Sequence, residues 1–266
     1  MKYSLSAKNL VNRNLEAHAS YCAGLMNVDA TKEITGVLRT DSGLLSHSFN
    51  QAVTTAVMPS RILQRFVVDY FRERHSPFTL WHCANRPLDA GEMSELGFKR
   101  QPSMVAMAAE VVRLAADEEL PENLQGKLEL APVTTESLEE YGQLQALAYS
   151  GEREGPQIRK FYQALAQVPE PKRSRLRYFA GRMDGKMVAG ASLYASADAL
   201  GFYDLFVDEQ YRGQGIGRAL FHYLVEQLQS SHHKHAVALT PADRQELLLE
   251  AGFFAVGEVA CYRFEP

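Results

Sequence analysis

The stretch GFYDLFVDEQYRGQGIGRAL, residues 201–220, decides the fold of this chain. Its first seven residues are mostly aromatic and apolar and predict a strand over 201–207. A short acidic turn leads into the glycine-rich segment RGQGIG (212–217). Apolar residues then recur with the 3.6-residue period of a helix, at Ile216, Ala219, Leu220, Tyr223, Leu224 and Leu228. A glycine turn between a strand and a helix start directs several backbone N–H groups toward one point, and the helix dipole favours an anion there. The stretch therefore predicts a binding site for a diphosphate.

Three phosphate-binding patterns compete for this segment. The Walker loop needs GxxxxGK[ST], and no Lys-Ser or Lys-Thr follows these glycines. The dinucleotide fingerprint has the spacing GxGxxG and an acidic residue about 20 positions on, whereas this segment has GxGxG followed by basic residues at 231–235. The third pattern, R/Q-x-x-G-x-G/A, matches residues 212–217 at every position. The alternative to all three is a glycine-rich turn that only permits tight packing.

In this pattern, and along residues 206–220 as a whole, the chain resembles the GNAT-type N-acetyltransferases, whose motif for the acetyl-CoA pyrophosphate has this form. The elements expected after residue 126 also follow the order of that family. They are strand 127–133, helices 136–149 and 157–168, strands 175–183, 186–195 and 201–207, helix 215–229, strand 235–240, helix 242–251 and strand 253–264. The resemblance implies an α/β (α+β) fold of the GNAT type, with a mixed, mostly antiparallel central sheet flanked by helices.

Composition and length narrow the remaining possibilities. A chain of 266 residues is long enough for two domains. The net charge of -4 argues against a nucleic-acid partner. No run of 18 apolar residues and no N-terminal signal pattern occurs, so we expect a cytoplasmic protein without a membrane partner. The three cysteines, Cys22, Cys83 and Cys261, are odd in number and far apart, which argues against a disulfide framework and a zinc site.

The polar, acidic segment 113–127, which contains Pro121, is the best candidate for a domain boundary. Before it, helix 61–72, strand 78–83 and helix 88–96 precede Gly97-Phe98 and strand 104–112. The order of helix, Gly-Phe and strand returns around Gly252-Phe253, which suggests a faint internal repeat. The first half resembles the N-terminal half of tandem GNAT proteins. We therefore expect a degenerate GNAT-like domain without the cofactor motif at 1–120 and a GNAT domain at 126–266. The alternative for the first half is an unrelated packing domain.

The resemblance also implies which residues bind acetyl-CoA, the expected cosubstrate. Backbone N–H groups of the glycine turn would hold the pyrophosphate, while Arg212 and Arg218 either add charge or are only solvated. The preceding strand would run beside the pantetheine arm, because in the family this strand splays from its neighbour and leaves backbone groups free. One freed N–H would act as an oxyanion donor. The expected cofactor contacts are Leu205, Phe206, Val207, Arg212, Gly213, Gln214, Gly215, Ile216, Gly217 and Arg218.

Asp204 is the candidate general base, because a carboxylate just before the cofactor segment could take the proton of an amine directly or through water. A hydrogen-bonded structural carboxylate is the alternative. Strand alternation places Tyr203 on the opposite face. Glu152 and Glu154 lie in the loop where the family binds the acceptor, although such a loop is more often only solvated.

The chain departs from the family at the general acid. Aligned on Gly252-Phe253, the usual tyrosine position is Leu248, and Pro241 stands where asparagine is common. Tyr194 or Tyr203 would then donate the proton, or the thiolate would leave unassisted, or catalysis has been lost. The sequence predicts an N-acetyltransferase that acts on a primary amine of a small molecule or peptide, as a monomer or homodimer. A non-catalytic acyl-CoA sensor and transfer of a longer acyl group are the alternatives.

Two further features have ordinary explanations. The histidine-rich loop 231–235 would bind zinc only with a carboxylate or cysteine beside it, and it has none in the sequence nearby. Trp81, with Phe78 and residues 70–71, is expected in the core of the first half.

Overall fold

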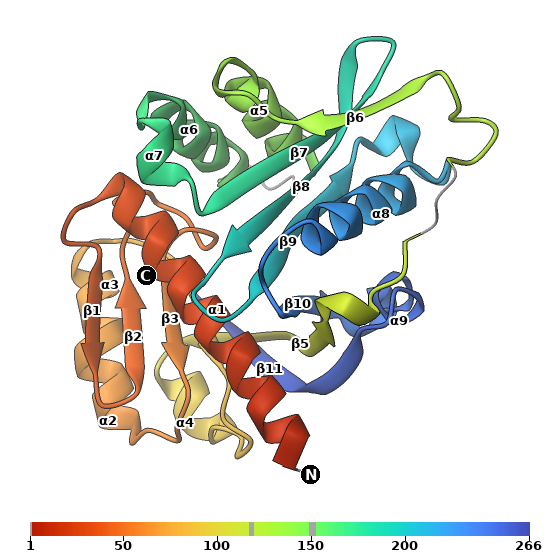
Figure 1. The fold of residues 1–266 in the computed structure, drawn as a ribbon. Helices are drawn as coiled ribbons and strands as arrows, with labels where there is room; N and C mark the ends of the chain where they lie inside the picture. The colour runs from red at the N-terminus through yellow and green to blue at the C-terminus, as the bar shows by residue number, and fades with distance from the viewer. Residues whose placement is uncertain (1, 117–119, 149–152) are drawn as a thin grey trace.

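One sheet of eleven strands connects the two halves of the chain (Figure 1). The computed structural model describes residues 2–116, 120–148 and 153–266, with side chains from residue 7 onward. The strand order is β1-β2-β3-β4-β11-β5-β10-β9-β8-β7-β6. The strands are β1 (Thr31–Ile34), β2 (Val37–Thr40), β3 (Gln51–Thr54), β4 (Phe78–His82), β5 (Phe98–Glu110), β6 (Leu128–Pro132), β7 (Leu176–Met183), β8 (Lys186–Ala195), β9 (Leu200–Val207), β10 (His235–Pro241) and β11 (Phe254–Phe264).

Helices cover both faces of this sheet. The described helices are α1 (Lys2–Met26), α2 (Ser60–Leu63), α3 (Asp69–Glu73), α4 (Ala90–Glu95), α5 (Leu138–Ala148), α6 (Glu154–Gln167), α7 (Glu170–Arg173), α8 (Ile216–Gln229) and α9 (Glu246–Glu250). A π-helical turn, Gln64–Val68, joins α2 to α3. No helix in the described ranges is long and apolar enough to cross a membrane.

The C-terminal half has the mixed, mostly antiparallel GNAT arrangement expected from the sequence. Its strands β6 to β9 form an antiparallel meander, and β9 then pairs in parallel with β10. Helix α8 packs on one face of this part of the sheet, and its apolar residues enter a core with β8 and β5. Helices α5 and α6 cover the other face around Tyr141, Phe161 and Tyr162.

The two halves exchange their last strands. The N-terminal β5 pairs with β10 of the C-terminal half, and the C-terminal β11 pairs with β4 of the N-terminal half. The exchanged strands also pair with each other. Each follows a short helix and a left-handed glycine, Gly97 (φ +90°) before β5 and Gly252 (φ +98°) before β11. This correspondence makes the first half compatible with a second GNAT-like unit. The domain limits at 1–120 and 126–266 remain predictions, since both segments share this sheet.

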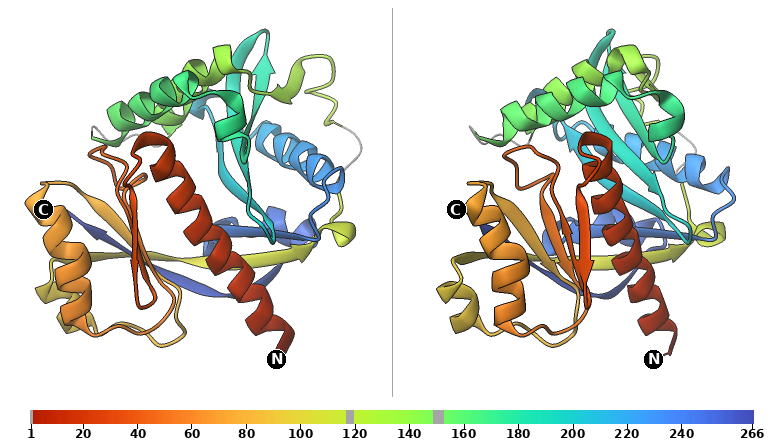
Figure 2. Two further views of the ribbon diagram at one scale, coloured as in Figure 1. Left: turned by 60° about the vertical axis from the view of Figure 1, so that its left-hand side comes forward. Right: turned by 90° about the vertical axis from the view of Figure 1, so that its left-hand side faces the viewer.

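Helix α1 lies across the junction of the two halves (Figure 2). It contacts β1 to β3 of the first half, the exchanged strands β5 and β11, and β9, β10 and α6 of the second half. Val11 and Leu15 are buried in a small core with Val53, Ala106 and Val237, which come from both halves. The helix therefore closes one side of the space between them. Neither α1 nor strands β1 to β3 was expected from the sequence, and β5 begins earlier than predicted.

Candidate active site

The glycine segment forms the N-terminal start of α8, as predicted. Gly213 and Gly215 have φ values of +75° and +89°, which favour glycine because a Cβ atom is strained in this region. Gly215 is the residue before the first helical turn, and no side chain caps that turn. The backbone N–H groups at the start of α8 are therefore available to an anion, and the helix dipole strengthens such binding.

The two arginines of the segment have partners within the protein. The Arg212 Nε atom donates to the carbonyl oxygen of Val207 at 3.2 Å, which ties the turn back to the end of β9. Arg218 forms an ion pair with Glu250 in the exposed part of the helix. Arg212 thus ties the turn to the end of β9, and Arg218 links α8 to α9.

Strands β9 and β10 separate beside this helix start. Their parallel pairing is confined to Leu200, Gly201 and Phe202 of β9, opposite residues 236–238. Within the described chain, the remaining residues of β9 pair only with β8. The backbone edge of Leu205, Phe206 and Val207 on the β10 side is thus not used by the sheet. This is the splay that the family resemblance implies.

A β-bulge at Asp204 reorients the side chains of β9. Tyr203 pairs with Ser192 and Phe206 pairs with Gly190, so that Asp204 and Leu205 both lie opposite Ala191. Asp204 has a φ of +56°, which is uncommon for a residue with a side chain. The alternation expected between Tyr203 and Asp204 is therefore wrong, because the extra residue interrupts the two-residue period. Both side chains line one cavity.

This cavity has a volume of about 490 Å³ and lies between the two halves. Its lining includes Phe202 to Leu205 of β9 and Ala238 to Pro241 of β10, on the two sides of the splay. Leu248 of α9, the residue at the usual tyrosine position, lines it as well. On the opposite side it is lined by residues of α1, of the segment 47–51 and of β4. The cavity thus connects the open edge of β9 with the first half of the chain.

Asp204 lies among hydroxyl groups inside the cavity. The Ser192 hydroxyl is 3.3 Å from the Asp204 Oδ2 atom and donates a hydrogen bond to it. Burial raises the pKa of Tyr162 and Tyr178 well above the ordinary value, and the charge of Asp204 contributes in the same direction. These tyrosines stay protonated at neutral pH, and Asp204 is the one carboxylate among the described residues that line the cavity.

The two candidate proton donors differ in position. The Tyr203 hydroxyl donates to the Asn14 Oδ1 atom at 2.7 Å, and its ring lines the cavity. The Tyr194 hydroxyl donates to the Ala17 carbonyl oxygen at 3.0 Å, and Tyr194 does not belong to the described lining. Burial raises the pKa of both groups, most strongly that of Tyr203. The structure therefore brings Asp204 and Tyr203 together, but not Tyr194.

Helix α1 adds a histidine and a cysteine that sequence reasoning missed. The His18 ring stacks on Tyr203 with 3.8 Å between the ring centroids, and its Nε2 atom is 3.4 Å from the Cys22 sulfur. Burial lowers the pKa of His18 to about 3, so the ring is neutral at physiological pH. Burial and the nearby Asp204 raise the pKa of the Cys22 thiol. Because α1 is far from β9 in sequence, no local pattern could have linked these residues to the site.

Two glutamates, Glu152 and Glu154, were predicted as possible contacts of the acceptor. Glu152 lies outside the described residues. Glu154 accepts hydrogen bonds from the Ser46 hydroxyl (2.8 Å), the His47 backbone N–H (2.7 Å) and the Ser48 hydroxyl (3.0 Å). Its carboxylate therefore connects α6 to the segment 46–48 of the first half.

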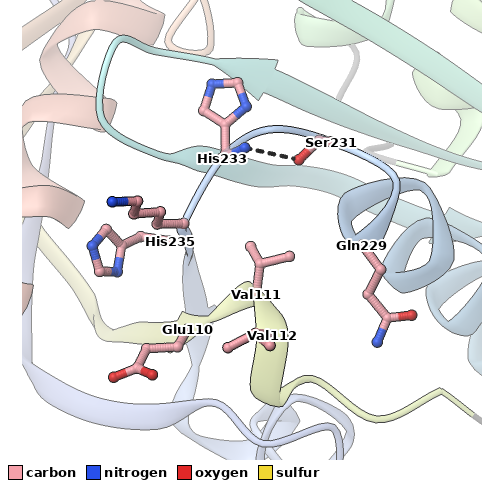
Figure 3. Close-up of a pocket in the computed structure, with 8 residues that line it drawn as sticks. Glu110, Val111, Val112, Gln229, Ser231, His233 and His235 are labelled. Carbon is pink, nitrogen blue, oxygen red and sulfur yellow. Dashed lines mark hydrogen bonds between the residues drawn. The ribbon is translucent and has the colours of Figure 1, made fainter.

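The histidine-rich loop lies at a separate, open hollow between the end of β5 and the start of β10 (Figure 3). The rings of His233 and His235 point in different directions there, and the backbone N–H of His233 donates to Ser231. The described residues contain no group of three His, Cys, Asp or Glu side chains placed to hold a metal ion.

Comparisons with known proteins agree with this fold. Residues 138–253 match the sequence model of the acetyltransferase (GNAT) family. A GCN5-related N-acetyltransferase from Kribbella flavida has a TM-score of 0.64 at 17% identity, with coverage of 94% of this chain and 95% of that one. A functionally unknown protein from Staphylococcus epidermidis has a TM-score of 0.66 at 12% identity, with coverage of 90% and 96%. No curated protein sequence matches the chain.

A tandem GNAT protein from the clavulanic acid biosynthesis pathway is also similar, with a TM-score of 0.54 at 14% identity over 89% of this chain and 84% of that one. At these identities the solved structures show the fold alone. The family match thus shows a GNAT-type domain at residues 138–253, and the solved structures show that the overall fold of the chain is shared with GNAT and tandem GNAT proteins.

Proposed function

We propose that this protein is an acetyl-CoA-dependent N-acetyltransferase that transfers an acetyl group to a primary amine by direct attack on the thioester. The observation that carries the proposal is the splay between β9 and β10, which opens the edge of β9 into the cavity that contains Asp204. Family membership supports acetyl transfer in general, and the arrangement of these residues supports the amine as acceptor.

The residues present fit coenzyme A. Left-handed glycines at 213 and 215 and the uncapped start of α8 suit a diphosphate. The part of β9 beyond Phe202, which does not pair with β10, suits the amides of a pantetheine arm. Gly217 lies against the strand, since a Cβ atom there would be 3.4 Å from a Val207 methyl group. When bound, acetyl-CoA supplies an activated acyl group with a thiolate as leaving group.

Asp204 would act as the base. Its carboxylate can take a proton from a protonated or attacking amine directly or through water, and the Ser192 hydroxyl holds it in place. An unpaired backbone N–H of β9 would stabilise the oxyanion that develops on the acyl carbonyl. The chain's own contribution is thus a base and a preorganised hydrogen-bond donor on the same strand.

No tyrosine stands at the usual position to donate a proton to the leaving thiolate, because that position is Leu248. Tyr203 carries the hydroxyl nearest in sequence to Asp204, but this hydroxyl donates a hydrogen bond to Asn14. A thiol has a pKa of roughly 8.5 and is a tolerable leaving group without an acid. We therefore propose that the thiolate leaves unassisted or receives its proton from solvent.

The proposal is tested by incubating the protein with acetyl-CoA and a panel of primary amines while free CoA is measured. Release of CoA that depends on both the amine and the protein is the expected result. Tight CoA binding by calorimetry with no release for any amine would contradict catalysis.

A non-catalytic acyl-CoA sensor is the second candidate, and Leu248 at the usual position of the general acid favours it. A sensor should bind acetyl-CoA and undergo a ligand-dependent change in stability without turnover. Replacing Asp204 should then leave its response to the ligand unchanged, whereas an enzyme should lose turnover.

A further inference from the structure

The segment 113–127, which joins the two halves, contacts both ends of α8. Near its start, the Leu114 carbonyl oxygen accepts a hydrogen bond from the side chain of Gln229, the last residue of the helix, at 2.8 Å. Toward its end, the Asn123 Nδ2 atom donates to the carbonyl oxygen of Gln214, two residues before the helix begins, at 3.1 Å. The segment that the sequence predicts as a domain boundary therefore lies against the helix that starts at the glycine turn.

Residues 121–128 of this segment form compact turns that lead into β6. The backbone N–H groups of Leu124 and Leu128 donate to the carbonyl oxygens of Pro121 and Leu124, at 2.8 and 3.0 Å. The Leu124 side chain is fully buried in the core that also contains Ile216 of α8. Since exposing a buried leucine to water is unfavourable, this packing holds the turns against the helix start.

Pro121 and Asn123 contact the glycine turn directly. A Cβ atom at Gly215 would lie 3.5 Å from the Pro121 Cγ atom, so the proline ring packs against the backbone of this glycine. The peptide between Gln214 and Gly215 is trans, and in a trans peptide the C=O and N–H groups point in opposite directions. The hydrogen bond from Asn123 to the Gln214 carbonyl oxygen therefore also fixes the direction of the Gly215 N–H, at the start of α8.

Other contacts hold the two ends of the glycine turn. The Arg212 side chain donates to the Val207 carbonyl oxygen, and a Cβ atom at Gly217 would lie 3.4 Å from a Val207 methyl group. Both contacts tie the turn to β9. Asn123 acts between them, on the peptide that precedes Gly215. The joining segment thus supports the middle of the turn.

We propose that the segment joining the two halves is part of the CoA site, and that Asn123 is a positioning residue that holds the glycine turn in its anion-binding shape. A turn that is already ordered loses less conformational freedom when a ligand binds, which raises the affinity. Asn123 acts through the Gln214 peptide, from a position 91 residues earlier in the chain. This inference rests on the proposed function, because it concerns the acetyl-CoA site of that function.

Asn123→Leu tests this role, because leucine keeps a branched side chain but cannot donate a hydrogen bond. CoA affinity measured by calorimetry should fall roughly two- to tenfold, the usual worth of one hydrogen bond. Without any ligand, hydrogen–deuterium exchange should be faster in the peptide that covers residues 208–217. The melting temperature should change little, since Asn123 is exposed. In the assay of CoA release, the variant should raise the KM for acetyl-CoA and leave kcat unchanged.

Gln125→Leu is the matched control. Gln125 is also exposed and belongs to the same turns, and its side chain donates to the Leu120 carbonyl oxygen at 3.0 Å within the segment. The substitution removes the same kind of hydrogen bond without affecting the bond to Gln214. CoA affinity and the exchange of residues 208–217 should therefore match those of the wild-type protein.

The outcomes separate this inference from the proposed function. An unchanged CoA affinity in Asn123→Leu, or an equal loss in Asn123→Leu and Gln125→Leu, overturns the role of Asn123 and leaves the acetyltransferase standing. Weaker CoA binding and faster exchange in Asn123→Leu alone, without CoA release for any amine, support the role of Asn123 and contradict the enzyme. No binding of CoA by the wild-type protein overturns both.

Discussion

Asp204 combines backbone strain with an acidic side chain at the place where β9 leaves its neighbour. A non-glycine residue at φ +56° is tolerated when the surroundings hold it, and such strain is common at functional sites. Aspartate and asparagine both accept this region more readily than other residues. Asparagine therefore offers a substitution that removes the charge without adding backbone strain.

We expect Asp204→Asn to lower kcat with little change in CoA affinity, because the carboxylate lines the cavity between the two halves and is not part of the α8 start. The loss should be on the order of 10²–10⁴-fold, the usual range for removal of a general base. Steady-state CoA release and calorimetry with CoA measure the two quantities. The surface Asp198→Asn, which removes only an exposed pair with Arg13, serves as the control. Full turnover in Asp204→Asn would favour a structural carboxylate.

His18 makes stability depend on pH. Burial lowers its pKa from 6.5 to about 3, so between these values the unfolded chain binds a proton that the native protein does not. The contribution of neutral His18 to the free energy of unfolding is fully present above pH 6.5 and is lost as the pH falls toward 3. The expected loss is up to about 1.4 kcal/mol of unfolding free energy per pH unit.

Urea unfolding of the wild-type protein and of His18→Phe across this pH range measures the effect. The variant keeps a ring against Tyr203 but cannot take up the proton, so its unfolding free energy should decline less steeply. Equal slopes for the two proteins would show that His18 is already accessible to protons in the native state.

At the scale of elements, the turn before α8 holds its shape through two left-handed glycines. Gly215→Ala should reduce CoA affinity by roughly tenfold or more, because a left-handed alanine costs about 1–2 kcal/mol and the turn would relax away from the anion. Gly185→Ala in the β7–β8 hairpin is the matched control, since Gly185 also has a positive φ (+80°) and open space for a Cβ atom. Both variants should lose similar stability.

Calorimetry with CoA distinguishes the two substitutions. Only Gly215→Ala should weaken binding. An equal effect of both would mean that general destabilisation, and not the geometry of the turn, controls affinity.

The elements around this turn could be predicted from sequence because their signals are local. The period of the α8 residues, the Asp184-Gly185 hairpin and the glycine pattern all act within a few positions. The predicted elements of the second half lie close to their observed bounds, except that helix 242–251 is a 3-10 turn followed by the short α9 (Glu246–Glu250). The bulge at Asp204 could not be predicted, since it depends on how β8 and β9 pair. The contribution of α1 to the cavity depends on packing between distant segments. The roles of Asp204, Tyr203 and Tyr194 stay predictions.

At the scale of the whole molecule, the strand exchange makes each half depend on the other. Residues 104–110 of β5 supply the pairing partner of the whole of β10, and β4 supplies a partner for the end of β11. The cavity has walls from both halves and from α1. The first half, which has no cofactor motif, therefore completes the sheet and forms one wall of the cavity.

This dependence predicts the behaviour of the separated halves. Residues 126–266 expressed alone should lack cooperative unfolding and CoA binding, because β10 would expose an unpaired edge and β11 would lose both neighbours. Coexpression with residues 1–120 should restore a complex that binds CoA, since each segment retains the strand that the other requires. Circular dichroism melting and calorimetry of the single and combined segments measure both effects. A C-terminal segment that melts cooperatively as a monomer and binds CoA as tightly as the full chain would show that the exchanged strand β5 is dispensable, and that the first half acts only on the acceptor.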